Sequence, residues 1–159
     1  MLSRLENAWN ALLASYAGLC GVEMTEIGVT ESWSVKDIIS HVTAWENEAL
    51  KHLPDILAGK RPPRYSVIYG GIDAFNKLVV NQSRNLSLAE ALQRRDETHQ
   101  QLIEYIQTAP EAQRATETRF LRGLRLDTYS HYLIHAEAIR KWRGLTDSTY
   151  LDERERTRG

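Results

Sequence analysis

Apolar residues recur every three or four positions along most of the chain, the spacing that places them on one face of an α-helix. This pattern predicts a first helix over 2–19, a second over 34–58, a shorter one over 72–84, a third long helix over 87–108 and a fourth over 125–143. Glycine and proline cluster between these stretches, and no run of strands is long enough to predict a sheet.

Local signals support several of these boundaries. Ser34 and Ser87 each precede an acidic residue by three positions, which is the capping box that begins a helix. Gly144 follows the predicted fourth helix and is expected to stop it. Pro54 lies inside the second helix, where the missing N–H predicts a kink or an early end.

Four long amphipathic helices and one short helix predict an all-α fold. We expect a four-helix bundle with an additional short helix in the long connection between helices two and three. At 159 residues the chain is most simply one domain. We assign 1–150 to the bundle and 151–159 to a charged C-terminal tail. Because that connection is long, up-down-up-down order is not assured.

Composition excludes some classes of function. The net charge of -1 gives no electrostatic case for nucleic acid. No stretch approaches the ~20 apolar residues of a membrane helix, and the first residues do not resemble a signal peptide. The single cysteine, Cys20, cannot form an intrachain disulfide, which fits a reducing compartment. We therefore expect a cytoplasmic protein without a nucleic-acid or membrane partner.

Two histidines lie in the apolar stripe of the fourth helix. His131 and His135 are four residues apart, so their rings lie one helical turn from each other. They are either hydrogen-bonded core residues or ligands of one metal ion, which would satisfy both imidazole acceptors at once. Leu126 and Leu133 point the other way, which predicts that a second side of this helix is covered.

A metal site needs a third ligand, and the periodicity does not choose it. His41 and His52 both lie at the rim of the apolar stripe of the second helix. His99 lies in a polar run and is expected to be solvated. Glu48 shares the rim with His41, where a solvated acid is the simpler interpretation and a general base is the alternative.

Two stretches resemble a known family. SWSVKDIISHVTAWENEAL resembles the second-helix signature of the DinB-like superfamily of four-helix-bundle proteins, in which a tryptophan is followed by a histidine eight residues later; here these are Trp33 and His41. LDTYSHYLIHAEAIRKW resembles the last-helix signature with its paired histidines. Together with GIDAFN, these stretches are most similar to the branch related to the colibactin self-protection protein. The resemblance implies a three-histidine site for a divalent metal at His41, His131 and His135.

The resemblance also implies a function. The ion would be zinc or nickel, and three protein ligands leave a fourth position open, which is typical of catalytic sites. Relatives include thiol-dependent isomerases and transferases. We therefore expect a metal-dependent thiol transferase or hydrolase that uses a low-molecular-weight thiol or detoxifies an electrophilic small molecule. The alternative is a non-catalytic protein that sequesters a small molecule, with a structural metal or none. A homodimer is a family-level expectation.

Further residues are candidates for the surroundings of this site. Trp45, Tyr132 and Trp142 would line it, although such aromatic residues are more often plain core. Asp37 and Asp127 each precede a candidate ligand by one turn. Their carboxylates could accept the second N–H of a ligating imidazole.

Overall fold

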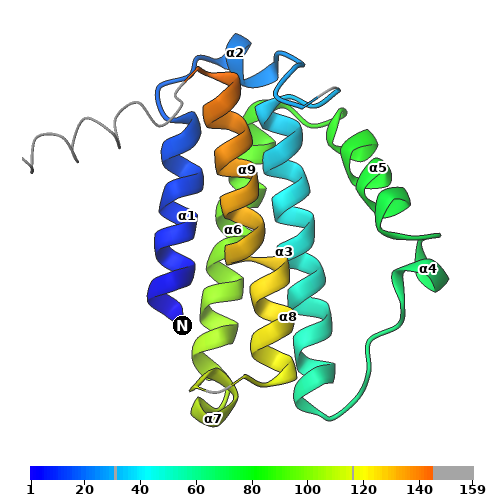
Figure 1. The fold of residues 1–159 in the computed structure, drawn as a ribbon. Coiled ribbons are helices and arrows are strands. Elements are labelled where there is room, and N and C mark those ends of the chain that lie inside the picture. The colour runs from blue at the N-terminus through cyan, green and yellow to red at the C-terminus, as the bar shows by residue number, and fades with distance from the viewer. Residues whose placement is uncertain (31, 116, 145–159) are drawn as a thin grey trace, which may run out of the picture.

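The computed structural model describes residues 1–30, 32–115 and 117–144, so the predicted tail at 151–159 lies outside the described residues. Within these ranges all regular elements are helices (Figure 1). They are α1 (Leu2–Tyr16), α2 (Gly21–Thr25), α3 (Val35–Leu57), α4 (Tyr65–Ile68), α5 (Ile72–Ser83), α6 (Leu88–Thr108), α7 (Glu111–Ala115), α8 (Arg119–Asp127) and α9 (Tyr129–Trp142).

The bundle consists of α1, α3, α6 and the consecutive pair α8–α9. In Figure 1, α1 and α9 run in one direction, whereas α3 and α6 run in the other. The packed pairs include α1 with α9, α3 with α6, and α3 with α8. The chain returns from the end of α3 to the start of α6 through α4 and α5, which lie outside α3. The predicted fold class, a helical bundle with a short helix in a long crossover, is confirmed.

The first and fourth predicted helices differ from the structure at their ends. The first helix ends at Tyr16, because Ala17 is extended and Gly18 has a positive φ of 80°. The fourth begins earlier than predicted, at Arg119, where the Thr118 hydroxyl accepts from the backbone N–H of Leu121. Gly144 follows the last helix with a positive φ of 71°, as predicted for its stop signal.

Thr128 interrupts the predicted fourth helix and divides it into α8 and α9. Its φ of -127° and ψ of -101° are not helical. The buried Thr128 hydroxyl donates to the carbonyl of Leu124 at 2.5 Å. Side-chain bonds of this kind compete with the helical ladder. The apolar pattern continues through Thr128, so it did not predict that the helix is broken there.

The core fills the space between α1, α3, α6 and α8–α9. The second side of the last helix is not covered, because Leu126 and Leu133 are 66% and 51% exposed. The prediction that this second side is covered was therefore wrong. No helix among the described residues combines the length and apolarity needed to cross a membrane. The fully buried core side chains include Leu5, Leu12, Ile38, Leu102, Phe120, Leu124, Tyr132 and Ile139.

The beginning of α3, the helix that carries His41, is fixed by the predicted capping box. Ser34 Oγ accepts from Asp37 N at 3.1 Å, and Asp37 Oδ2 accepts from Ser34 N at 2.9 Å. The hydroxyl of Ser83 on α5 donates to Asp37 Oδ1 at 3.2 Å, which ties the crossover to this end of α3. Helix α3 continues through Pro54 and ends at Leu57, one residue before the predicted end, so the early end expected at the proline does not occur.

Ser34→Ala is expected to lower the free energy of unfolding by about 1–2 kcal/mol, because Ser34 is a buried N-cap residue. Ser87→Ala is the matched control, since Ser87 has the same capping geometry at the exposed start of α6. We expect it to cost less than about 1 kcal/mol. Urea unfolding measures both. A larger loss for Ser87→Ala would contradict the importance of the buried cap.

Candidate metal centre

The structure brings the three predicted histidines together. His41 Nε2 on α3 lies 2.8 Å from His131 Nε2 on α9, and His135 Nε2 lies 2.9 Å from the same atom. One ring nitrogen from each histidine lies within 4.8 Å of the other two. His41 is buried, whereas His131 and His135 are partly exposed. The histidine site is therefore reached from the α9 side.

All three imidazoles are neutral near pH 7. Burial, with a smaller contribution from repulsion by the other two histidines, lowers the pKa of His41 to about 2. Burial is also the main cause that brings the pKa of His131 to about 3 and that of His135 to about 4. Neutral imidazole is the form that binds metal ions.

The donor set fits a divalent ion better than a hydrogen-bonded core. His131 Nε2 faces two other Nε2 atoms, yet a single ring nitrogen is either a donor or an acceptor and satisfies only one of them well. Nitrogens bound to one tetrahedral ion at ~2.1 Å lie about 3.4 Å apart. Small ring movements would therefore be enough to accommodate zinc or nickel.

The predicted acceptors for the second ring nitrogens are not in place. Nδ1 of His41 and Nδ1 of His131 are buried without a hydrogen-bond partner. Asp37 accepts from Ser34 and Ser83 instead. Since His131 Nδ1 has no partner, Asp127 does not orient that ring. The prediction that these two carboxylates support the site was wrong.

His52 is not part of the site, because its Nε2 lies 3.0 Å from Glu48 Oε2. Glu48 is buried, so the expectation of a solvated acid was also wrong. It accepts from Lys51 at 2.5 Å, from Tyr69 at 3.0 Å and from Tyr65 at 3.2 Å. Burial alone would raise the pKa of Glu48, but the bonds from Lys51 and Tyr69 outweigh it and lower the pKa.

An acidic pair, Glu48 and Asp127, lies further along the same side of α3. Glu48 follows His41 by two turns of α3, and Asp127 is the last residue of α8, four positions before His131. Burial raises the pKa of Asp127 to about 7, and the negative charge of Glu48 contributes. Burial likewise raises the pKa of Tyr65, with Glu48 and Asp127 adding to the effect. The region next to the histidines thus holds one charged carboxylate and one that exchanges its proton near neutral pH.

Aromatic rings from the crossover cover this region. The ring centroid of Trp45 lies 5.8 Å from that of His131, and 5.2 Å from those of Tyr65 and Phe75. The ring of Trp33 packs on that of His41, with the two centroids 4.8 Å apart. Trp45 is therefore confirmed as a neighbour of the histidines. The contribution of Tyr65 was missed because α4 is a single turn without a periodic pattern. Phe75 lies on the predicted short helix, but the periodicity of that helix does not show which part of α3 it packs against.

The other two proposed lining residues lie elsewhere. Trp142 lies beside Gly28. Tyr132 is in the core, where it packs on Trp9 with ring centroids 5.3 Å apart and donates to the carboxylate of Glu46. The prediction that they line the site is not supported by these contacts.

His99 is not solvated, contrary to expectation. Its ring stacks on Trp9 with centroids 3.6 Å apart, and its Nδ1 lies 2.8 Å from Glu46 Oε1. Glu46 is fully buried and also accepts from the Tyr132 hydroxyl. These residues form a polar network between α1, α3, α6 and α9 that does not include the three clustered histidines. The polar sequence around His99 does not predict this interaction, because the partner, Glu46, lies on α3.

Comparison with known proteins adds a family and a fold. A family model described as the DinB superfamily matches residues 4–138. A solved structure described as "Sibling Lethal Factor Precursor - DfsB" is similar with a TM-score of 0.73 and 17% sequence identity. The similarity covers 91% of this chain and 94% of that one. No curated protein gives a significant match. At this identity the structural similarity is evidence for the fold alone.

Proposed function

Since the chain belongs to the DinB superfamily, we propose that it is a metal-dependent member that binds one divalent ion, zinc or nickel, through His41, His131 and His135. The observation that carries this proposal is the convergence of three neutral imidazoles, in which one Nε2 atom faces two others. Three histidines leave a fourth position open, whereas structural zinc sites are closed by four protein ligands.

The proposed reaction is transfer of a low-molecular-weight thiol to an electrophilic small molecule. A bound divalent ion supplies Lewis acidity, which lowers the pKa of a water or thiol in the open position. The sulfur forms a bond to the electrophilic carbon, and the electron pair displaced from that carbon takes up the thiol proton. Trp33 and Trp45 provide apolar walls that shield His41 from water. We assign the holding and release of a proton to Asp127, because burial raises its pKa to about 7.

A second candidate is a protein that binds and sequesters a small molecule without turnover. The aromatic cover favours it, because Trp45, Tyr65, Tyr69 and Phe75 form a continuous set of ring contacts against which a planar molecule can stack. In this case the metal only braces α3 against α9. Removing the metal would then lower the melting temperature and abolish no activity.

Metal content by plasma mass spectrometry tests the site itself. Protein made without an affinity tag is expected to hold about one equivalent of zinc or nickel, because the three histidines form one donor set. His41→Ala and His135→Ala are expected to lose it. His52→Ala is the matched control, since His52 lies on the same helix as His41 but pairs with Glu48, and it is expected to keep the metal.

A parent protein that holds no metal and takes up neither added zinc nor added nickel would rule out the metal-dependent function. Equal loss of metal in His52→Ala would show that the choice of ligands is wrong. With the site established, a screen of electrophiles with low-molecular-weight thiols separates the two candidates. Turnover lost in His135→Ala supports the transferase, and binding without turnover supports the sequestering protein.

A further inference from the structure

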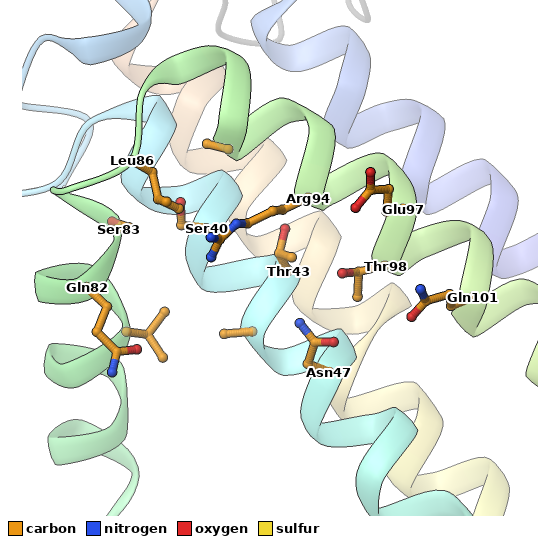
Figure 2. A pocket seen from close by; sticks show the side chains of 13 residues that line it. Ser40, Thr43, Asn47, Gln82, Ser83, Leu86, Arg94, Glu97, Thr98 and Gln101 are labelled. Atoms are coloured by element: carbon orange, nitrogen blue, oxygen red, sulfur yellow. The ribbon is translucent and has the colours of Figure 1, made fainter.

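A second hollow lies on a different side of α3, between α3, α5 and α6 (Figure 2). Its volume is about 280 Å³. The α3 residues that line it, such as Ser40 and Thr43, face roughly 120° around the helix axis from His41 and Trp45. None of the three histidines lines this cavity, and neither does the acidic pair. It is therefore a separate site from the metal centre.

Two hydroxyl groups in the cavity have no partner within the described part of the chain. Thr98 is only 7% exposed, and Figure 2 shows its side chain directed from α6 toward the cavity. Ser40 Oγ is buried and makes no hydrogen bond. By contrast, Thr43 donates to the carbonyl of Ile39 at 2.8 Å. Because buried hydroxyls nearly always have a partner, these two are available to a ligand.

The charged residues that line the cavity are one arginine and one glutamate. Arg94 and Glu97 lie about one turn apart on α6, but they form no ion pair with each other. Arg94 reaches across the cavity toward Ser40, whereas Glu97 stays on the α6 side (Figure 2). Glu97 accepts only from the Gln93 amide at 2.7 Å. Arg94 makes no hydrogen bond or ion pair among the described residues, although its charge contributes to lowering the pKa of Glu90, one turn earlier on α6. The opening therefore presents one positive and one negative group that are separated in space.

Side-chain amides add neutral hydrogen-bonding groups around the opening. Asn47, Gln82 and Gln101 lie on three different helices, and all three are exposed (Figure 2). Within the described residues their side chains make no hydrogen bond. One positive and one negative side chain, together with neutral amides, suit a polar ligand whose net charge is zero. A simple anion would face repulsion from Glu97, and a simple cation would face repulsion from Arg94.

We propose that this cavity binds a small zwitterion of amino-acid or dipeptide size. Its carboxylate lies against the guanidinium of Arg94, because an arginine binds a carboxylate with two parallel hydrogen bonds. Its ammonium group lies toward Glu97, and the Thr98 and Ser40 hydroxyls bind its polar groups. The size follows from the volume of about 280 Å³, which is just below the ~300–1,000 Å³ typical of ligand pockets.

Isothermal titration calorimetry with L-glutamine and glycylglycine tests this proposal. At least one of them is expected to bind the parent protein. Arg94→Gln is expected to weaken that binding about tenfold, since it removes a charge-assisted contact. Glu97→Gln is expected to weaken it to a similar degree. The acetylated ligand, which lacks the ammonium group, is expected to bind the parent more weakly and to be indifferent to Glu97→Gln.

Two variants serve as controls. Arg122→Gln removes an exposed arginine on α8, away from the cavity, and is expected to bind like the parent. His135→Ala is expected to keep the binding, because the cavity does not use the metal centre. Arg94 and Glu97 are exposed, so thermal melting is expected to show that their variants fold normally.

The proposal is overturned if neither zwitterion binds at millimolar concentration. It is also overturned if Arg94→Gln binds as tightly as the parent, or if Arg122→Gln weakens binding equally. Binding that disappears in His135→Ala but survives in Arg94→Gln would place the ligand at the histidines instead.

Discussion

Replacing Tyr132 by alanine is expected to lower the free energy of unfolding by about 4 kcal/mol. Tyr132 is fully buried between α1, α3 and α6, and it packs on Trp9. The change leaves a cavity and also removes a hydrogen bond from the buried carboxylate of Glu46. Because domains of this size are stable by only about 5–15 kcal/mol, the loss is a large fraction of the total. Guanidinium unfolding followed by circular dichroism measures it.

Tyr132→Phe separates packing from hydrogen bonding. It keeps the ring and removes only the hydroxyl, so Glu46 retains His99 as a partner. We expect a loss of about 1–3 kcal/mol, the usual cost of leaving a buried polar group less well satisfied. If Tyr132→Phe were as destabilising as Tyr132→Ala, the hydrogen bond to Glu46 would be the main contribution of this residue. If both were neutral, the described core would be wrong.

Saturating zinc is expected to raise the melting temperature by about 8–16 °C. An ion present at a thousand times its dissociation constant adds about 4 kcal/mol to the stability of the folded form. Each kcal/mol corresponds to about 2–4 °C for a protein of this size. The physical reason is that the ion cross-links α3 to α9 through His41, His131 and His135. Differential scanning fluorimetry with zinc, and separately with nickel, measures the shift.

His41→Leu is the informative variant for this prediction. It is expected to lose the zinc-dependent shift completely. In the metal-free form, however, we expect it to be at least as stable as the parent, because leucine removes a buried Nδ1 that has no hydrogen-bond partner. A metal-free His41→Leu protein that is several kcal/mol less stable would mean that His41 is a structural core residue. The change in stability of the metal-free variant therefore separates the two cases: no loss indicates that His41 is a ligand, and a large loss indicates that it is a core residue.

The sequence predicts the long elements of this fold well, because each buries one continuous face. The capping box at Ser34 and the stop at Gly144 appear as predicted. The failures have a common physical cause. The turns α2, α4 and α7 are too short to show a 3.6-residue period, and the break at Thr128 depends on a hydrogen bond to Leu124. The spacing of apolar residues therefore predicts neither the short helices nor the break.

For the candidate site, the spacing predicted that His131 and His135 lie side by side, but it left open whether they are core residues or ligands and did not choose the third histidine. His41 and His52 are equivalent in periodicity, and only the family resemblance separated them. The structure separates them through Glu48, which pairs with His52. His99 shows the opposite failure. This histidine in a polar run is partly buried, because its partner, Glu46, lies on another helix and cannot be inferred from neighbouring residues.

The packing of α1 against α9 has a consequence for synthesis of the protein. These two helices lie side by side in the bundle, although α2 to α8 lie between them in the sequence (Figure 1). During translation, at about 5–20 residues per second, α1 therefore waits several seconds with its apolar face uncovered. His131 and His135 emerge with the same late helix. A nascent chain that has not reached α9 carries His41 alone, so the histidine site assembles only after nearly all of the bundle has been made.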